Sequence, residues 1–274
     1  MKLSLYSDDV VLLITGCVSP SPNQAFHALK DVKVRFQQYV DSITWFLYHS
    51  SFKNIVFCEN SNYFVFEDNA LREKEKLCEL AAKQHKRLEV ISFQGDFAMV
   101  EKTNKGYGEG EIIQYALKQS ELLRRAKSFC KVTGRVEVLN IDDVFSKIEY
   151  GQNYFNRDLA HGRRSIDTRI FCCDIEYYKR NLMLLYKQLE PQNSIEGLFW
   201  LTLRDLDKWN STYAYPDFHG ICGATDQPYD INKYLVKVMS IACRLHIYNS
   251  IALPLYTALR KIELKLSSWG GNKN

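Results

Sequence analysis

The chain of 274 residues is 46% apolar, so it can bury a sizeable core and is close to the upper size of a single domain. It has no run of eighteen uninterrupted apolar residues and no basic segment leading into an apolar one, so neither a membrane-spanning helix nor a secretory signal is expected. Its eight cysteines are scattered without a CxxC pair, which is typical of reduced thiols. These features predict a cytoplasmic protein.

The formal net charge of +4 is concentrated at the C-terminus. Residues 231–274 contain seven Lys or Arg residues and one Glu in amphipathic patterns, which predicts a basic helical tail packed on a domain of residues 1–230. Such a tail favours contact with an anionic membrane surface or an acidic ligand. Arg260 and Lys261 could reach a departing phosphate or the membrane, although a solvated helix face is the simpler explanation. Without a nucleic-acid motif, no nucleic-acid partner is expected.

The first part of the chain alternates between short apolar runs and amphipathic patterns. Residues 10–15 (VVLLIT) predict a strand buried on both faces, and Asp31 is placed to cap the helix that follows. Further strands are predicted at residues 55–58 and 88–93, with a charged helix between them. The alternation predicts a doubly wound, Rossmann-type α/β fold: a mostly parallel sheet with right-handed crossovers and helices on both faces.

Polar residues follow the first two predicted strands, at the edge where open α/β sheets bind ligands. Thr15, Gly16 and Val18 stand at the end of the first strand and in the loop after it. Glu59 and Asn60 follow the second strand and could hydrogen-bond a base or a ribose, although a solvated turn explains them almost as well.

Residues 105–143 are predicted to form a glycine-rich loop, an amphipathic helix, a short buried strand and a polar turn. Gly106, Gly108 and Gly110 alternate directly after Lys105, so a flexible backbone with free N–H groups would meet a bound anion such as phosphate. The pattern matches neither the dinucleotide fingerprint nor the phosphate loop that ends in GK[ST]. A mobile surface turn before a helix is the alternative.

A basic turn follows the strand predicted at residues 129–132. Its polar residues are Lys131, Thr133, Gly134 and Arg135. Two cations and a hydroxyl around a glycine suit a diphosphate, because Arg offers a planar fork of donors and Lys a compact charge. Alternatively, Lys131 snorkels and Arg135 pairs with Glu137 at the surface.

The second half of the chain is less regular. Residues 145–164 have no clear periodicity and are predicted to be an ordered loop or a short substrate-side insertion, whereas residues 168–173 predict a strand. Asp174 is placed to cap the next helix. Asn193 stands three residues before Glu196, which matches the capping-box spacing with Asn as the cap.

Several segments resemble a group of bacterial glycosyltransferases encoded with capsule and lipopolysaccharide genes, which are similar to the GT-A (nucleotide-diphospho-sugar transferase) fold. The matching segments are LLITGCVSP, KDVKVRFQQYVDSI, FKNIVFCENSN, KGYGEGEIIQYAL, FCKVTGRVEVLN and DTRIFCCD followed by an EG-containing helix. They run from Leu12 to Phe199. The resemblance implies a transferase that moves a sugar from a nucleotide-sugar donor to a saccharide or lipid-linked saccharide acceptor near the inner membrane leaflet.

The resemblance also assigns roles along the sheet. The residues predicted to bind the donor are Thr15, Gly16, Val18, Glu59, Asn60, Lys105, Gly106, Lys131, Thr133, Gly134 and Arg135. Related transferases carry a metal-binding Asp-x-Asp after the fourth strand, where this sequence has KVTGR. Lys131 or Arg135 is therefore expected to neutralise the diphosphate without a metal. Asp142 and Asp143 keep a magnesium or manganese site as the alternative.

Inverting glycosyl transfer needs a carboxylate that accepts the proton of the acceptor hydroxyl. The resemblance favours Glu196, because related enzymes place an acidic residue at the start of a helix in the second half; the capping-box role competes directly. Asp226 and Asp217, within the aromatic segment of residues 213–230, are the reserve candidates. Two other classes stay open: a non-catalytic nucleotide- or sugar-binding module, and a nucleotidyltransferase acting on sugar phosphates.

Overall fold

The computed structural model describes residues 1–21, 31–158, 164–204, 209–221, 229 and 232–250. Within them, a six-stranded sheet has the order β3-β2-β1-β4-β7-β6, and a two-stranded ribbon pairs β5 with β8. The strands are β1 (Val10–Gly16), β2 (Asn54–Glu59), β3 (Arg87–Ser92), β4 (Ser128–Thr133), β5 (Val136–Val138), β6 (Tyr154–Arg157), β7 (Ile166–Asp174) and β8 (Phe218–Gly220). β1 to β4 are parallel to one another, whereas β7 is antiparallel to both β4 and β6.

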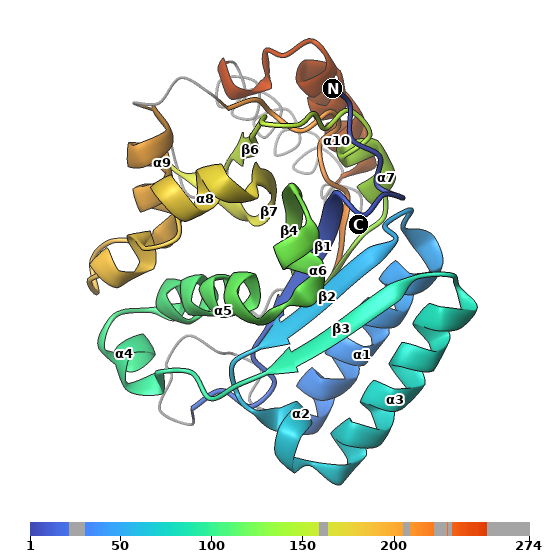
Figure 1. The fold of residues 1–274 in the computed structure, drawn as a ribbon. Helices are drawn as coiled ribbons and strands as arrows, with labels where there is room; N and C mark the ends of the chain where they lie inside the picture. The colour runs from blue at the N-terminus through green and yellow to red at the C-terminus, as the bar shows by residue number, and fades with distance from the viewer. Residues whose placement is uncertain (22–30, 159–163, 205–208, 222–228, 230–231, 251–274) are drawn as a thin grey trace, which may run out of the picture.

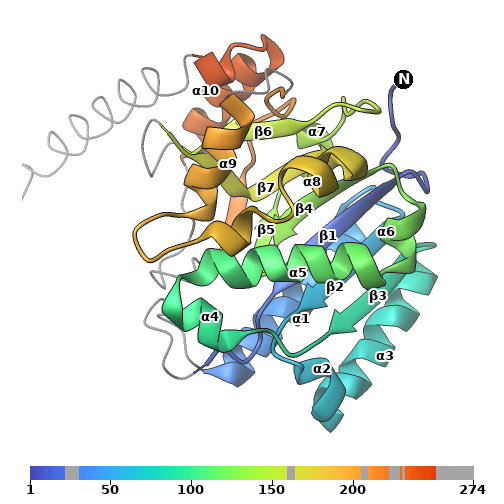
Figure 2. The ribbon, with the colours of Figure 1, turned by 60° about the vertical axis from the view of Figure 1, so that its left-hand side comes forward.

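Helices cover both faces of this sheet (Figures 1 and 2). One face is covered by α1 (Val32–His49), α2 (Tyr63–Phe66) and α3 (Asp68–Lys83). On the other face lie α4 (Phe97–Lys102), α5 (Lys105–Gln119), α6 (Glu121–Arg125), α8 (Ile175–Asn181), the 3-10 helix η1 (Leu185–Gln188) and α9 (Ile195–Arg204). α7 (Ile141–Val144) and α10 (Lys233–Arg244) follow β5 and β8. The predicted fold class, a mostly parallel α/β sheet with helices on both faces, is confirmed.

β1 lies at the centre of the sheet and packs against both helical layers. Val10, Leu12 and Ile14 point into the core shared with α1 and α3, while Val11 and Leu13 point into the core shared with α5. All five side chains are fully buried. A strand whose alternate side chains enter two cores has a continuous apolar sequence. The strand buried on both faces that VVLLIT predicted is therefore confirmed.

Two predicted helix caps are confirmed by the hydrogen bonds at the helix starts. The Asp31 carboxylate accepts from the backbone amides of Lys33 at 2.9 Å and Val34 at 3.2 Å, and the Asp174 carboxylate accepts from the amide of Tyr177 at 2.9 Å. These oxygens satisfy N–H groups that have no partner inside the helix.

The loop predicted at residues 145–164 is wrong in part, because it contains the edge strand β6 (Tyr154–Arg157). Tyr154 and Phe155 pair with Cys172 and Phe171 of β7. Its sequence, YFNR, neither alternates between apolar and polar residues nor forms a continuous apolar run, so its pattern does not predict a strand.

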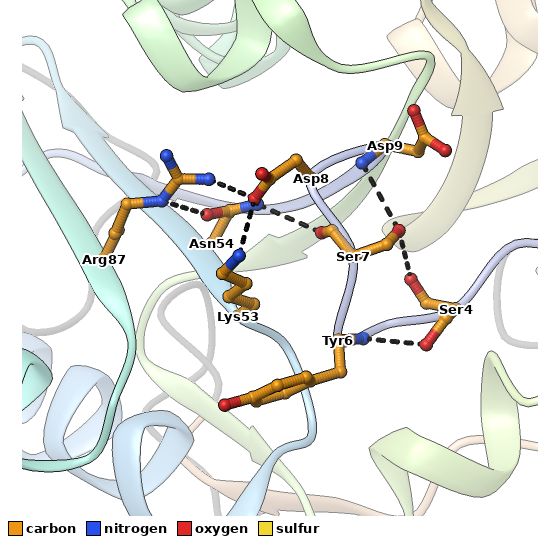
Figure 3. Close-up of polar contacts among 8 residues, drawn as sticks. All are labelled: Ser4, Tyr6, Ser7, Asp8, Asp9, Lys53, Asn54 and Arg87. Atoms are coloured by element: carbon orange, nitrogen blue, oxygen red, sulfur yellow. Dashed lines mark hydrogen bonds and ion pairs between the residues drawn. The ribbon is translucent and has the colours of Figure 1, made fainter.

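A polar cluster ties together the starts of β1, β2 and β3 (Figure 3). Asp8 accepts hydrogen bonds from Arg87 and, at 3.3 Å, from the Asn54 amide nitrogen, and its ion pair with Lys53 spans 3.1 Å. The Lys53 hydrogen bond is the main cause that lowers the pKa of Asp8. This cluster occupies the amino edge of the parallel strands, opposite the carboxyl edge.

The C-terminal part has a small core of its own. Val236, Met239 and Cys243 of α10 pack with Tyr215 and Tyr248. The end of the predicted tail, with Arg260 and Lys261, lies outside the described residues, so the division at residue 230 stays a prediction. Among the helices that the structure describes, none has the length and apolar character needed to cross a membrane.

Candidate functional site

The carboxyl edge of the sheet is formed where β1, β2 and β4 end, at Gly16, Glu59 and Thr133. Thr15 pairs with Thr133 in the register of β1 and β4, and the Gly134 amide donates a 2.8 Å hydrogen bond to the Thr15 carbonyl oxygen. A Cβ atom on residue 134 would lie 2.6 Å from that oxygen, so the close approach requires glycine. The predicted residues of the first and fourth strand ends are therefore neighbours.

Helix α1 holds the backbone of the loop after β1. The Tyr39 hydroxyl accepts from the Cys17 amide at 2.9 Å, and Arg35 Nε donates to the Val18 carbonyl oxygen at 3.1 Å. Arg35 is only 1% exposed, and this burial lowers the pKa of its guanidinium. The Val18 side chain is itself fully buried in the core. Any contact between Val18 and a donor would therefore have to come from its backbone.

The two predicted residues at the end of β2, Glu59 and Asn60, differ in whether their side-chain oxygens already accept hydrogen bonds. Glu59 is fully buried and accepts from the amides of Ser61 (2.7 Å) and Tyr63 (2.8 Å), and from the hydroxyls of Ser61 (2.5 Å) and Ser92. Its carboxylate organises the turn after β2. Asn60 is also buried, but its Oδ1 atom has no hydrogen-bond partner among the described residues. A buried polar atom without a partner calls for an explanation, and a bound ligand is one.

Arg135 offers a cation beside Gly134 at the same edge. Its guanidinium lies 5.9 Å from the centre of the Tyr39 ring, and Nη1 donates to Gln38 Oε1 at 3.3 Å. The Nε atom is buried and makes no hydrogen bond within the part of the chain that the structure describes. The ion pair with Glu137 that was the alternative is absent from the described contacts of Arg135. The guanidinium of Arg135 therefore has N–H groups that could donate hydrogen bonds to an anion.

Lys131 points into the layer between the sheet and α5, and it is fully buried. Its ammonium group forms an ion pair with Glu109 of α5 and donates to the Thr133 hydroxyl at 3.0 Å and to the Thr168 carbonyl oxygen at 2.6 Å. An ammonium group has three N–H donors. All three therefore have protein acceptors in this structure, and Lys131 does not snorkel to the surface.

A bulge in β7 shapes the part of that strand that faces Lys131. Phe155 of β6 pairs with Phe171, and Arg157 pairs with Ile166, so two steps along β6 correspond to five along β7. Extra residues in one strand re-aim side chains and occur frequently beside active sites. Here the bulge presents Thr168, which directs its carbonyl oxygen toward Lys131.

Glu196 lies at the start of α9, next to the same bulge. Its carboxylate oxygen Oε1 is 3.3 Å from the Thr168 hydroxyl, and its side chain is half-buried. The predicted Asn193 cap is wrong: Ser194 Oγ accepts from the Gly197 amide at 3.1 Å, while Asn193 accepts from an amide of the preceding turn. The carboxylate of Glu196 is therefore not used in a capping box.

The predicted glycine-rich loop is wrong, because helix α5 (Lys105–Gln119) already begins there. Asn104 caps it by accepting from the Gly106 amide at 3.0 Å, and Lys105 is exposed in the first turn. Glycine has a low helix propensity, which is why the pattern resembled a loop. The cap and the tertiary packing around Gly108 and Gly110 overcome that preference.

These glycines allow close contact between α5 and its neighbours. A Cβ atom on residue 106 would lie 3.0 Å from the side chain of Ile195, and one on residue 110 would lie 2.6 Å from Cγ of Tyr186. The glycines thus bring α5 close to η1 and to the start of α9, which carries Glu196. Whether the start of α5 also contacts a donor, as predicted for Lys105 and Gly106, stays a prediction.

The alternative metal ligands lie away from the carboxyl edge, in α7. Asp142 accepts from the Ser51 amide at 2.8 Å and from its hydroxyl at 2.5 Å, just before β2 begins, and Asp143 pairs with Arg244 at 2.7 Å. Figure 1 shows α7 close to the N-terminus of the chain. Among the described residues no group of three or more His, Cys, Asp or Glu side chains is placed to hold a metal ion. Metal dependence stays a prediction to be tested.

The reserve candidates are only partly within the described residues. Asp217 is joined to α7 through its backbone, with its amide donating to Asn140 Oδ1 at 2.8 Å. Asp226 lies outside the described residues, as do Arg260 and Lys261.

Two residues of the candidate site, Arg35 and Glu109, were not predicted from the sequence. Arg35 stands one position before Phe36 on the buried face of α1, and a charged residue on an otherwise apolar face was a detectable signal. Glu109 had no such signal, because it lies within a segment interpreted as a loop. Its ion pair with Lys131 depends on how α5 packs over β4.

The sequence matches no protein-family model and no curated protein sequence. Among solved structures, the chain is similar to the glycosyltransferase GlyE of Streptococcus pneumoniae, with a TM-score of 0.46 and 9% identity over 74% of this chain and 44% of that chain. It is also similar to an active-site mutant of LgtC, with a TM-score of 0.43 and 9% identity over 71% of this chain and 70% of the other. A 4-diphosphocytidyl-2C-methyl-D-erythritol synthase from Anaerococcus prevotii gives a TM-score of 0.40 and 8% identity over 87% and 97%.

Proposed function

We propose that this protein is a glycosyltransferase that moves a sugar from a nucleotide-sugar donor to a saccharide or lipid-linked saccharide acceptor, with inversion at the sugar carbon. One observation carries the proposal: Glu196, a half-buried carboxylate not used as a helix cap, stands beside the Lys131 network at the carboxyl edge where the basic turn of Arg135 also lies. The sequence segments that resemble bacterial glycosyltransferases supply the same set of residues.

The donor would lie across the ends of β1, β2 and β4. Asn60 carries the unpartnered acceptor that suits a base or ribose N–H or O–H group, and the guanidinium of Arg135 suits the diphosphate. Thr15 and Gly16 form the floor between them, because their strand lies between β2 and β4. This assignment gives the phosphate-binding role to Arg135, because the N–H groups of Lys131 already have acceptors.

In the transfer step the acceptor hydroxyl oxygen attacks the anomeric carbon of the donor sugar. The bond from that carbon to the phosphate oxygen breaks, and the nucleoside diphosphate leaves with the electron pair. The proton of the hydroxyl goes to the carboxylate of Glu196, which acts as the general base. Positive charge at Arg135 stabilises the leaving group as its negative charge develops.

The proposed acceptor and location rest on the sequence resemblance to bacterial glycosyltransferases and not on contacts at the site. Capsular polysaccharide or lipopolysaccharide precursors are the acceptors that the resembling bacterial enzymes suggest. Basic residues of α10 and the following tail, among them Lys237, Arg260 and Lys261, would favour a peripheral position at an anionic inner leaflet.

Donor hydrolysis tests the proposal. UDP-, GDP- and CMP-sugars are incubated with the protein, and release of free sugar is measured for wild type, Glu196→Gln and the matched surface control Glu121→Gln, whose carboxylate is exposed on α6. We expect Glu196→Gln to lower kcat by about 10²- to 10⁴-fold while nucleotide affinity stays unchanged. Stabilisation by nucleotides without turnover would indicate a binding module, and synthesis of nucleotide-sugar from a sugar phosphate would indicate a nucleotidyltransferase.

The phosphate assignment has a separate test. Arg135→Gln should weaken the affinity for the nucleoside diphosphate by about 10- to 150-fold, the effect of losing a hydrogen bond to a charged group, and leave affinity for the nucleoside unchanged. Arg125→Gln, on the exposed side of α6, is the control. Donor hydrolysis that vanishes in EDTA and returns with manganese would contradict metal-independent neutralisation by Arg135.

A further inference from the structure

We propose that Lys131 binds no substrate phosphate and is instead a positioning residue, which aims the carboxylate of Glu196 through the Thr168 peptide. The inference rests on the proposed function, because Glu196 is the base there. It reverses the first expectation for Lys131, in which a cation at a strand end was assigned to the diphosphate.

The contacts of the ammonium group support this role. Lys131 is 0% exposed, so its charge is removed from water, a state that a protein tolerates only with a counter-ion and good hydrogen bonds. Glu109 supplies the counter-ion, and the Thr133 hydroxyl and the Thr168 carbonyl oxygen accept the other two hydrogen bonds. A donor phosphate would have to displace one of these acceptors.

The Lys131–Glu109 pair carries no net charge. A diphosphate at the carboxyl edge would meet a neutral pair there, and at Arg135 a cation that forms no ion pair with the described residues. Of the two basic residues of the KVTGR turn, Arg135 thus attracts the leaving group. Lys131 instead links secondary-structure elements.

Three elements meet at Lys131. The residue belongs to β4, Glu109 to α5 and Thr168 to the bulge of β7. The bulged backbone is not held by the ladder with β4, whose pairing ends at Val132 and Ile170. Two hydrogen bonds orient that peptide: the 2.6 Å bond from Lys131 to the Thr168 carbonyl oxygen, and the 3.0 Å bond from the Arg169 amide to Asp167 Oδ1. Lys131 supplies the one that comes from outside β7.

The Thr168 peptide in turn orients its side chain. Thr is branched at Cβ, so its χ1 angle is restricted once the backbone is fixed. The hydroxyl then lies 3.3 Å from Glu196 Oε1 and holds the carboxylate at the start of α9. Glu109 thus positions Lys131, Lys131 positions Thr168, and Thr168 positions Glu196. Of these four residues only Glu196 contacts substrate.

Variants of Thr168 test the last link. Thr168→Val keeps the shape and removes the hydroxyl, and Thr168→Ser restores it. We expect Thr168→Val to lower kcat about 10-fold, the effect of one misoriented hydrogen bond, with KM and nucleotide affinity unchanged, and Thr168→Ser to recover most of the loss. An unchanged kcat in Thr168→Val, or equal losses in both variants, would overturn the link to Glu196.

Variants of Lys131 test the first link without requiring turnover. Lys131→Met alone leaves the partly buried Glu109 without its partner and can fail to fold. The double variant Glu109→Leu/Lys131→Met, which removes both charges together, is therefore made beside it. We expect the double variant to bind nucleoside diphosphate within about 3-fold of wild type, well short of the loss that one charged hydrogen bond would cause. A loss matching that of Arg135→Gln would show that Lys131 binds phosphate.

A crystal structure of the double variant provides the remaining readout. We expect the separation between Thr168 Oγ1 and Glu196 Oε1 to increase when the ammonium group is absent. An unchanged separation would overturn the positioning role even if the protein proved to have no transferase activity. Absence of donor hydrolysis in the wild type would instead refute the proposed function and leave this structural comparison valid.

Discussion

Replacing Gly110 by Ala should destabilise the protein, although Ala is the better helix former. Ala in a helix interior is favoured over Gly by about 1 kcal/mol. The new Cβ atom would lie 2.6 Å from Cγ of Tyr186, whereas carbon atoms in contact are separated by about 3.5–4.0 Å. Cβ of Tyr186 would lie closer still, so α5 and η1 would have to move apart by more than about 1 Å to relieve the overlap.

Tyr186 cannot easily retreat from that atom. Its ring is 4% exposed and packs edge-on against Tyr107 at 4.9 Å, and its hydroxyl is bound to Gln114 at 2.5 Å. Overpacking of this kind costs about 1–3 kcal/mol, and such a confined contact is expected at the upper end. After the helix-propensity gain, the net loss is about 2 kcal/mol.

The measurement is urea unfolding followed by circular dichroism, with a thermal melt in parallel. A loss of this size lowers Tm by about 4–8 °C for a domain near this length. Two glycines serve as controls. A Cβ on residue 108 would meet Asn60 at 3.1 Å, so Gly108→Ala is expected to change stability by less than about 1 kcal/mol. Gly197→Ala, with its nearest atom at 3.4 Å in α9, should gain about 0.5–1 kcal/mol.

A Gly110→Ala variant as stable as wild type would show that the contact between α5 and η1 does not require glycine. If Gly110→Ala and Gly108→Ala both fold normally but both lose nucleotide affinity, the result would support the glycine-rich anion-binding loop predicted from the sequence.

Three further outcomes follow from the hydrogen bonds and pKa shifts. Asp31→Ala removes a side chain that accepts from two amides at the start of α1, and it should cost about 1 kcal/mol in urea unfolding; no change would mean that water replaces the cap. Burial raises the pKa of Glu111 above its unfolded value, so its ionisation reduces stability as pH rises through the folded pKa. Glu111→Gln should therefore raise Tm relative to wild type at pH 8 and lose that advantage at pH 4, whereas an equal difference at both values would contradict this. Burial also raises the pKa of Cys17 to about 12, so its alkylation by iodoacetamide at pH 7.5, followed by mass spectrometry, should be about 10³-fold slower than for a free thiol; fast labelling in the native state would disprove it.

The sequence alone determined the layers of the fold. The continuous apolar run of β1 predicted a strand between two cores, and Asp31 and Asp174 marked two helix starts, because these signals depend on residues close in the chain. The order of the residues also placed Thr15 and Gly134 at the carboxyl edge, since parallel strands align their ends.

Only the tertiary structure shows which groups surround the charged residues. The sequence predicted Lys131 as a phosphate ligand, and the structure places Glu109 and Thr168, far from it in sequence, around its ammonium group. The helical state of the glycine segment likewise depends on the close approach of Tyr186 and on the Asn104 cap, which outweigh the local preference of glycine for a loop. Local patterns predict elements because their physics is local, whereas the state of a buried charge is set by whichever groups the fold brings to it.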